Sequence, residues 1–416
     1  MAPGASDSHE VLSVLDRPIA LHNLTYLDEG DEVTVGRPDI DSYAILPLEG
    51  AALLRRLGDG MTPRQAAAWY EQTYGEMADV EDFLAGVGEL GFIRAPDEDA
   101  VGSGQVRWQR LSQAVFSPVS GFLFVLLMTA CGVLLVRDPA LRPSYHQFFF
   151  TKYITVMAVG LFLIQFPLIL IHESAHALAG RRLGLRTRLS LGRRLYFVVF
   201  ETSMDGLVTV PRRKRFLPML AGILADLVVY AIFVIVASLT LHGGQPTMAG
   251  TVALVIAIDT LLRVAWQFYF HLRTDMYYVA VTMFRCADLQ TVAQQMLRNR
   301  MHRLLGYPRT PADESGWHPR DRAVARWYSW LLLLGNAFSI GTLLIVVLPA
   351  TIRVVRLASH ALTGAAGVPR MADSIVVVLL SAGQLIIAGW LAWRSRRRRR
   401  STSPSDPSDP SDPSDA

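Results

Sequence analysis

Two histidines and a glutamate form the pattern most able to do chemistry, in the segment His172-Glu-Ser-Ala-His176. On a helix, residues four apart face the same way, so the imidazoles of His172 and His176 could hold one Zn²⁺ between them. Glu173, beside the first histidine, could take a proton from a metal-bound water. The spacing therefore predicts a zinc hydrolase site.

The pattern lies near the end of an apolar run from Phe166 to Gly180, in a stretch long enough to cross a bilayer. Ionisable residues are costly in lipid, so inside a membrane helix they indicate function by default. The alternative is a pair of core histidines that neighbouring arginines satisfy. We favour the functional interpretation, in which the site lies within the membrane.

The composition indicates an integral membrane protein. Of 416 residues, 51% are hydrophobic and only 18% are charged, and the mean hydropathy is +0.29. The first ten residues are polar and acidic and do not begin a signal peptide, so we expect the N-terminus to stay in the cytoplasm. The two cysteines, Cys131 and Cys286, lie far apart and are expected to be packing residues.

Window hydropathy predicts about six transmembrane helices. Their approximate ranges are 118–136, 154–180, 216–241, 248–284, 328–352 and 374–393. The fourth exceeds a hydrocarbon core of about 30 Å, so it should bend, break or project beyond the membrane. Within it, Asp259 and Arg263 are four residues apart and are expected to form a buried ion pair.

Arginine-rich loops predict the orientation through the positive-inside rule. Ten Arg and Lys residues lie between 181 and 215, and seven arginines lie between 298 and 326. Both loops are expected in the cytoplasm, and an even number of spans also places the C-terminus there, in an inner or cytoplasmic membrane. In the first loop, residues 196–200 and 207–210 are expected to form a hairpin.

The segment from 20 to 95 is expected to be a small α+β, winged-helix-like domain. Three short strands are predicted at 21–27, 32–36 and 42–46, followed by three helices. The second helix should begin with the capping box Thr62-Pro-Arg-Gln65 and end at Gly75, and the third should lie between Asp79 and Gly91. Its acidic strands and turns argue against nucleic-acid binding.

The remaining boundaries follow from composition. Residues 1–19 are expected to be disordered, 96–117 to be a linker and 118–393 to be the membrane domain. The end of the chain, 394–416, combines a basic stop with a Pro-Ser-Asp repeat that should be disordered. The fold class is therefore a mainly α-helical polytopic membrane protein with a small N-terminal domain.

A catalytic zinc usually has three protein ligands and one open position, so one further ligand must come from elsewhere in the chain. Asp275 and Asp226 both lie about as deep in the membrane as His172, at roughly 15 Å from the nearest cytoplasmic arginine. Either could reach the zinc. Asp205 precedes a glycine and is expected in the hairpin turn. His271 is expected to be a structural residue or one that supports a ligand.

The chain also resembles two known families. The first resemblance is carried by Asp41-Ser-Tyr-Ala-Ile-Leu46, Leu57-Gly-Asp-Gly-Met-Thr62 and the stretch from Phe83 to Ile93. In these segments the N-terminal domain resembles PqqD-like peptide-recognition domains. The resemblance implies that it binds a precursor or leader peptide as an added strand. It also implies peptide-modifying enzymes as further partners.

The second resemblance is to the site-2 protease family of intramembrane zinc metalloproteases. It rests on HExxH together with Gly222-Ile-Leu-Ala-Asp226 and Arg273-Thr-Asp275-Met-Tyr-Tyr278. It implies that His172, His176 and Asp275 bind zinc and that Glu173 is the general base. Gly222 and Asp226 would line the site, where Asp226 would hold the substrate backbone or the developing oxyanion.

The chain departs from this family's motifs at four positions. Ile223 replaces a proline, Asp226 an asparagine and Met276 a glycine, and Phe270 stands where a proline is common. An aspartate in place of asparagine adds a negative charge, or a proton, near a dication.

The predicted function is hydrolysis of a peptide bond in a small, ribosomally made precursor peptide that the N-terminal domain captures. One alternative is a regulatory protease that cleaves a membrane-bound transcription regulator. Another is a peptide export or immunity protein without proteolytic activity. Zinc content separates this last class from the first two.

Overall fold

The computed structural model describes residues 15–95 except 31 and 41, then 106–144, 147, 154–194, 197–305 and 313–349, and the positions 352, 356, 383, 386 and 390. The chain forms two compact units. The first contains the residues up to Phe124 together with Ser174–Arg188 and Thr202–Gly222, and the second contains the rest. The boundary falls within three helices, α6 Pro118–Arg137, α7 Ile154–Arg182 and α8 Arg212–Leu239.

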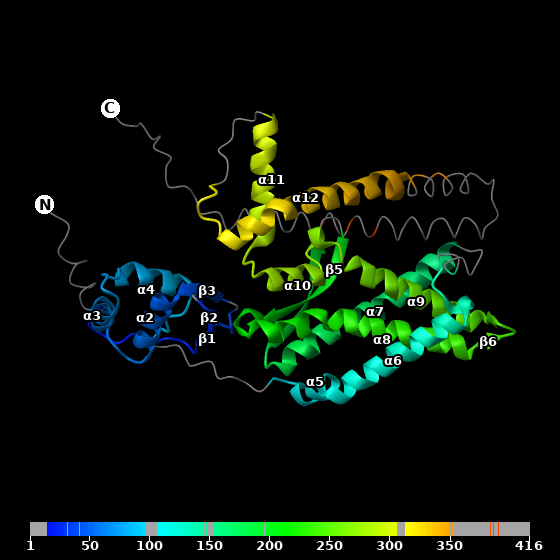
Figure 1. The fold of residues 1–416 in the computed structure, drawn as a ribbon, viewed down its shortest axis with the longest axis horizontal. Coiled ribbons are helices and arrows are strands. Elements are labelled where there is room, and N and C mark those ends of the chain that lie inside the picture. Colours follow the sequence, from blue (N-terminus) through cyan, green and yellow to red (C-terminus); the bar gives the residue numbers. More distant parts are fainter. Residues whose placement is uncertain are drawn as a thin grey trace, which may run out of the picture. The chain divides into compact units, whose positions relative to one another are not determined.

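The first unit contains the N-terminal domain, an antiparallel sheet followed by three helices (Figure 1). Its strands lie in the order β1-β2-β3. Their bounds are Thr25–Asp28, Glu32–Arg37 and Ser42–Pro47, and the helices are α2 Leu48–Gly58, α3 Pro63–Tyr74 and α4 Val80–Glu89. The predicted order and number of these elements are confirmed, although β1 begins four residues later than expected.

The predicted helix ends of this domain are also confirmed. Thr62 accepts a hydrogen bond from the amide of Gln65, whose side chain accepts one from the Thr62 amide. Gly75 ends α3 with φ +77°, and Asp79 caps α4. Glycine is favoured at such a C-cap because it has no Cβ to clash in the left-handed conformation.

Alternate side chains of β2 contribute to the core of this domain. Val33 and Val35 point inward with no exposed surface and pack against Ala51, Leu54 and Phe92. This places one face of the sheet under helix α2. The domain therefore has a core of its own.

The buried guanidinium of Arg37 links the end of β2 to the segment that follows α4. It donates hydrogen bonds to the carbonyl of Gly91 at 2.6 Å and to the carboxylate of Asp39 at about 3 Å. Burial raises the pKa of Asp39, but the hydrogen bonds from Arg37 and from its own backbone outweigh this effect and lower the pKa.

Five helices among the described residues are long and apolar enough to cross a membrane. They lie within α6 Pro118–Arg137, α7 Ile154–Arg182, α8 Arg212–Leu239, α9 Met248–Trp266 and α12, which runs from Pro319 to Thr342 and continues as the π-helix Leu343–Val347. The prediction of a helical membrane protein is confirmed to this extent. The predicted sixth span, 374–393, lies almost wholly outside the described residues, as does the tail.

Two helices differ from the predicted bounds. The helix α12 begins at Pro319, nine residues before the predicted span, because its first turns carry arginines that hydropathy excludes. In the predicted linker, the short helix α5 occupies Gln109–Val115.

Small side chains hold three helices of the second unit together. Cys131 of α6, Ala231 and Val234 of α8, and Ala257 of α9 form one buried cluster. The predicted packing role of Cys131 is thus confirmed. Further along the bundle, α7 joins α8 and α9 through Leu168 and its neighbours. Figure 1 shows these long helices in the same region of the molecule.

The predicted long fourth span does break, as its length required. The helix α9 ends at Trp266, a 3-10 turn covers Phe270–Leu272, and α10 runs from Asp275 to Phe284. A second cluster, built around Tyr277, Leu289 and Tyr328, packs α10 against α11 Leu289–Leu305 and α12.

The predicted hairpin exists but was placed wrongly. Its strands are β4 Arg186–Arg194 and β5 Phe197–Asp205, and the segment Leu207–Thr209 is a 3-10 turn. Asp205 therefore ends a strand instead of forming the hairpin turn. Residues 186–194 were not predicted as a strand. Four of them are charged arginines, so the two-residue alternation of apolar and polar side chains that indicates a strand is hard to recognise there.

Candidate metal centre

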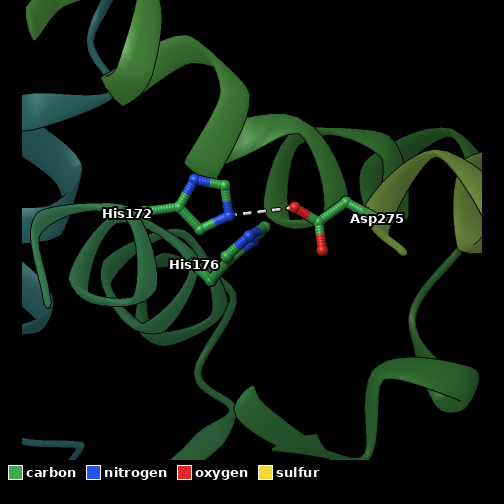
Figure 2. A group of neighbouring side chains, drawn as sticks. All are labelled: His172, His176 and Asp275. Atoms are coloured by element: carbon green, nitrogen blue, oxygen red, sulfur yellow. Dashed lines mark hydrogen bonds and ion pairs between the residues drawn. The ribbon is translucent and has the colours of Figure 1, made fainter. Parts of the chain in front are cut away.

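Helix α7 carries both predicted histidine ligands, one turn apart and pointing the same way (Figure 2). His172 is 4% exposed and His176 is 5% exposed. Asp275 comes from the first turn of α10. The nearest ligand atoms of the three residues all lie within 4.8 Å of one another. The fold thus brings together the three residues that the sequence predicted as zinc ligands.

The break in the fourth span is what turns Asp275 toward the histidines. Arg273 adopts a left-handed conformation with φ +56° and Thr274 an extended one, so that a new helix starts at Asp275. The Thr274 hydroxyl donates to the backbone carbonyl of Gln267 at 2.6 Å, and the Asp275 amide donates to the side chain of Gln267 at 3.3 Å. These bonds hold the backbone from which the carboxylate of Asp275 projects.

Each histidine uses Nδ1 for a fixed acceptor, which leaves Nε2 for a metal. His176 Nδ1 lies 2.7 Å from the carbonyl oxygen of Pro218. A carbonyl can only accept, so this nitrogen carries the proton. His172 Nδ1 lies 2.8 Å from a carboxylate oxygen of Asp226. Partners of this kind orient metal-binding imidazoles and raise their basicity.

A cation fits the position between His172 and Asp275. With the His172 proton on Nδ1, the lone pair of Nε2 faces a carboxylate oxygen of Asp275 at 3.1 Å. Two acceptors this close repel unless a proton or a metal ion lies between them. Zinc bonds of about 2.0–2.2 Å place tetrahedral ligand atoms about 3.3 Å apart, close to this distance and below the 4.8 Å that bounds the group.

The carboxylate of Asp226 is completely buried and is held by Arg263. The guanidinium Nη2 lies 2.7 Å from one oxygen, and Nε lies 3.1 Å from both. One of these oxygens also accepts the bond from His172. A buried carboxylate needs such compensation to remain charged. Asp226 therefore positions His172, while the substrate-binding role predicted for it stays a prediction.

The predicted ion pair between Asp259 and Arg263 is wrong. Arg263 pairs with Asp226, one helix away, and Asp259 accepts a hydrogen bond from the Gln165 side chain at 2.8 Å. The amide oxygen of Gln165 in turn accepts from Arg263 at 3.3 Å. Residues four apart on one helix are neighbours, but a fully buried carboxylate on α8 attracts the guanidinium more strongly than Asp259 does.

The other predicted residues lie as follows. Glu173 follows the first ligand on α7 and is 9% exposed, and the buried Gly222 lies one turn before Asp226 on α8. His271 bonds the Ser339 hydroxyl at 2.9 Å, in keeping with a structural role. Asp205 pairs with Arg188 at 3.7 Å and is not a member of the metal group.

Three members of the polar network around the ligands were missed: Gln267, which bonds Asp275; Arg263, which bonds Asp226; and Gln165, which bonds Arg263. Each stands in a predicted apolar span, where an amide or a charge without a partner would be costly. That feature could have identified them as members of a buried network.

No family model, curated protein or solved structure matches this chain. The chemistry of the site therefore rests on the contacts above.

Replacing Arg263 by methionine should weaken zinc binding by about tenfold to a hundredfold, since residues that support a ligand have effects of this size. Without Arg263, the buried Asp226 is uncompensated and a poorer partner for His172. Competition with a zinc chelator measures the affinity.

The matched control is Arg300→Met, which removes an arginine that bonds Ser329 on the distant α12. It should leave the zinc affinity unchanged. Equal affinities of Arg263→Met and wild type would show that Asp226 does not need its guanidinium partner.

Proposed function

We propose that this protein is an intramembrane zinc metalloprotease that hydrolyses a peptide bond in a small precursor peptide captured by its N-terminal domain. The observation that carries the proposal is the convergence of His172, His176 and Asp275 from two helices, with Glu173 beside the first ligand. Two imidazoles and one carboxylate form a ligand set of the kind found in catalytic zinc sites.

In this proposal His172, His176 and Asp275 would hold the zinc, with Nε2 of each imidazole and one carboxylate oxygen as ligand atoms. When bound, a zinc ion supplies Lewis acidity for the scissile carbonyl and lowers the pKa of a water molecule. The carbonyl of Pro218 and the carboxylate of Asp226 keep both imidazoles in the tautomer that binds metal.

Glu173 is the general base. Its carboxylate accepts a proton from the attacking water and passes it to the nitrogen of the leaving amine, so that one water is added across the peptide bond. Burial of Glu173 at 9% exposure reduces competition from solvent for this proton.

The arginine-rich ends of α7 and α8 support a cytoplasmic position for this end of the bundle. We place the protein in an inner or cytoplasmic membrane with the N-terminal domain in the cytoplasm. A precursor peptide made by ribosomes would then meet this domain without crossing the membrane.

The purified full-length protein in detergent should cleave members of a pool of synthetic peptides, with each product pair gaining one water. Mass spectrometry detects the new termini. A zinc chelator should abolish cleavage, and added Zn²⁺ should restore it.

Cleavage that persists under the chelator would contradict the proposal. So would the absence of any cleavage by zinc-loaded protein, both of soluble peptides and of peptides that contain a transmembrane segment. Cleavage of the transmembrane peptides alone would favour the regulatory protease.

A further inference from the structure

A cavity of about 630 Å³ lies in the first unit. Its wall is formed by the start of the N-terminal sheet and by the segments that follow α7 and precede α8. Four positive side chains line it: Arg94, Arg182, Arg186 and Lys214. This cavity is separate from the metal centre, since neither the zinc ligands nor Glu173 line it.

The positive charge of this wall is not compensated. Within the described part of the chain, Arg94, Arg182, Arg186 and Lys214 form no ion pair. The cavity also has two acidic residues, Asp39 and Asp205, but each already has an arginine partner. The partner of Asp39 is Arg37 at 3.0 Å, and that of Asp205 is Arg188 at 3.7 Å. Unpaired cations gathered around one cavity attract an anionic ligand.

The same cavity touches an open sheet edge. Residues His22 to Thr25 form part of the wall. The His22 amide already bonds the carbonyl of Phe92 at 2.9 Å, so the open edge begins where β1 begins, at Thr25. In the described residues β1 pairs only with β2, so its other edge has no partner strand. An edge of this kind can bind an extended peptide through backbone hydrogen bonds.

The cavity lies near the end of the helix that carries the zinc ligands. Arg182 follows His176 by six residues on α7, a distance of about 9 Å along the helix axis. Three extended residues of a peptide cover about 10 Å. A peptide held in the cavity therefore has its neighbouring residues within reach of His176.

We propose that this cavity binds an acidic, extended segment of the peptide substrate, next to the bond that is cut. The inference rests on the proposed function for the identity of the ligand as substrate. A lipid headgroup would need only the arginines at the helix ends. The cavity also includes Arg94 and the edge of β1, both in the N-terminal domain, and these additional contacts favour a peptide as the ligand.

Binding tests this proposal without any need for catalysis. The probes are three fluorescent peptides of equal length, rich in aspartate and glutamate, in lysine, or in serine and glycine. The full-length Glu173→Gln variant in detergent should bind the acidic peptide and not the others. Higher salt should weaken binding, because the contacts are between charges near solvent.

The triple variant R182Q/R186Q/K214Q should bind the acidic peptide at least about tenfold more weakly, since each exposed charge contact contributes modestly. The matched control is R110Q/R213Q/R298Q, which removes the same charge from positions that do not line the cavity. It should bind as tightly as the parent, and zinc content should be equal in all three proteins.

The inference would be overturned if parent and triple variant bound the acidic peptide equally, or if neither bound it. In either case a normal zinc content would leave the proposed function intact. The purified proteins are also analysed for bound anionic phospholipid. If the lipid copurifies with the parent and is lost only from the triple variant, while peptide binding is unchanged, the cavity binds a lipid headgroup instead.

Discussion

Wild-type protein purified without chelator is expected to carry about one zinc ion per chain, and the double variant H172A/H176A none. The two imidazoles provide two of the three ligands, and the remaining carboxylate of Asp275 cannot hold the ion alone. Metal binding also replaces the proton that otherwise has to lie between His172 and Asp275, so zinc relieves an unfavourable contact. Elemental analysis of protein resupplied with metal measures the stoichiometry.

The control variant H242A/H318A removes two histidines outside the metal group and should keep its zinc. This control separates the specific site from general binding of zinc by histidines. Wild-type protein that holds no zinc after resupply would eliminate the metalloprotease and leave a protein that binds or transports peptides.

Replacing Glu173 by glutamine is expected to lower the rate of peptide hydrolysis by between about a hundredfold and about ten-thousandfold, the usual contribution of a general base. Glutamine has nearly the same shape but cannot accept the proton of the attacking water at neutral pH. Because Glu173 is not one of the three ligands, the zinc content should stay at the wild-type value. Single-turnover cleavage of a peptide found in the pool assay measures the rate.

Glu71→Gln in the N-terminal domain is the matched control and should cleave at the wild-type rate, since this glutamate lies in α3. Activity of Glu173→Gln within a few fold of wild type would assign proton transfer to another residue. Loss of zinc from this variant would instead give Glu173 a part in holding the metal.

Local patterns predicted most of the N-terminal domain. The alternation of Val33 and Val35, the capping box at Thr62 and the glycine at 75 each depend on neighbours in the sequence. Such short-range preferences act within a few residues, so they can be read without knowing the fold. The misplaced hairpin shows where this fails, because β4 has only Leu189 and Leu191 as apolar side chains among four arginines, which is too short an alternation to stand out.

The length of the fourth apolar stretch predicted that it had to bend, break or project, but not the position of the break. Only the structure shows that it falls between Trp266 and Asp275 and turns the aspartate toward the histidines. The backbone at Asp275 is held by hydrogen bonds that the Thr274 hydroxyl and the Asp275 amide donate to Gln267, seven or eight residues earlier in the chain.

By itself, the sequence determined that this chain has helices long and apolar enough to cross a membrane and two histidines one turn apart in one of them. The period of the helix and the cost of charge in lipid are sufficient for that conclusion. Tertiary structure alone decided that Arg263 pairs with Asp226 instead of Asp259, and that Asp226 thereby fixes the proton of His172. Partners on different helices are chosen by the packing of those helices and by the burial of the carboxylate, which no local pattern records.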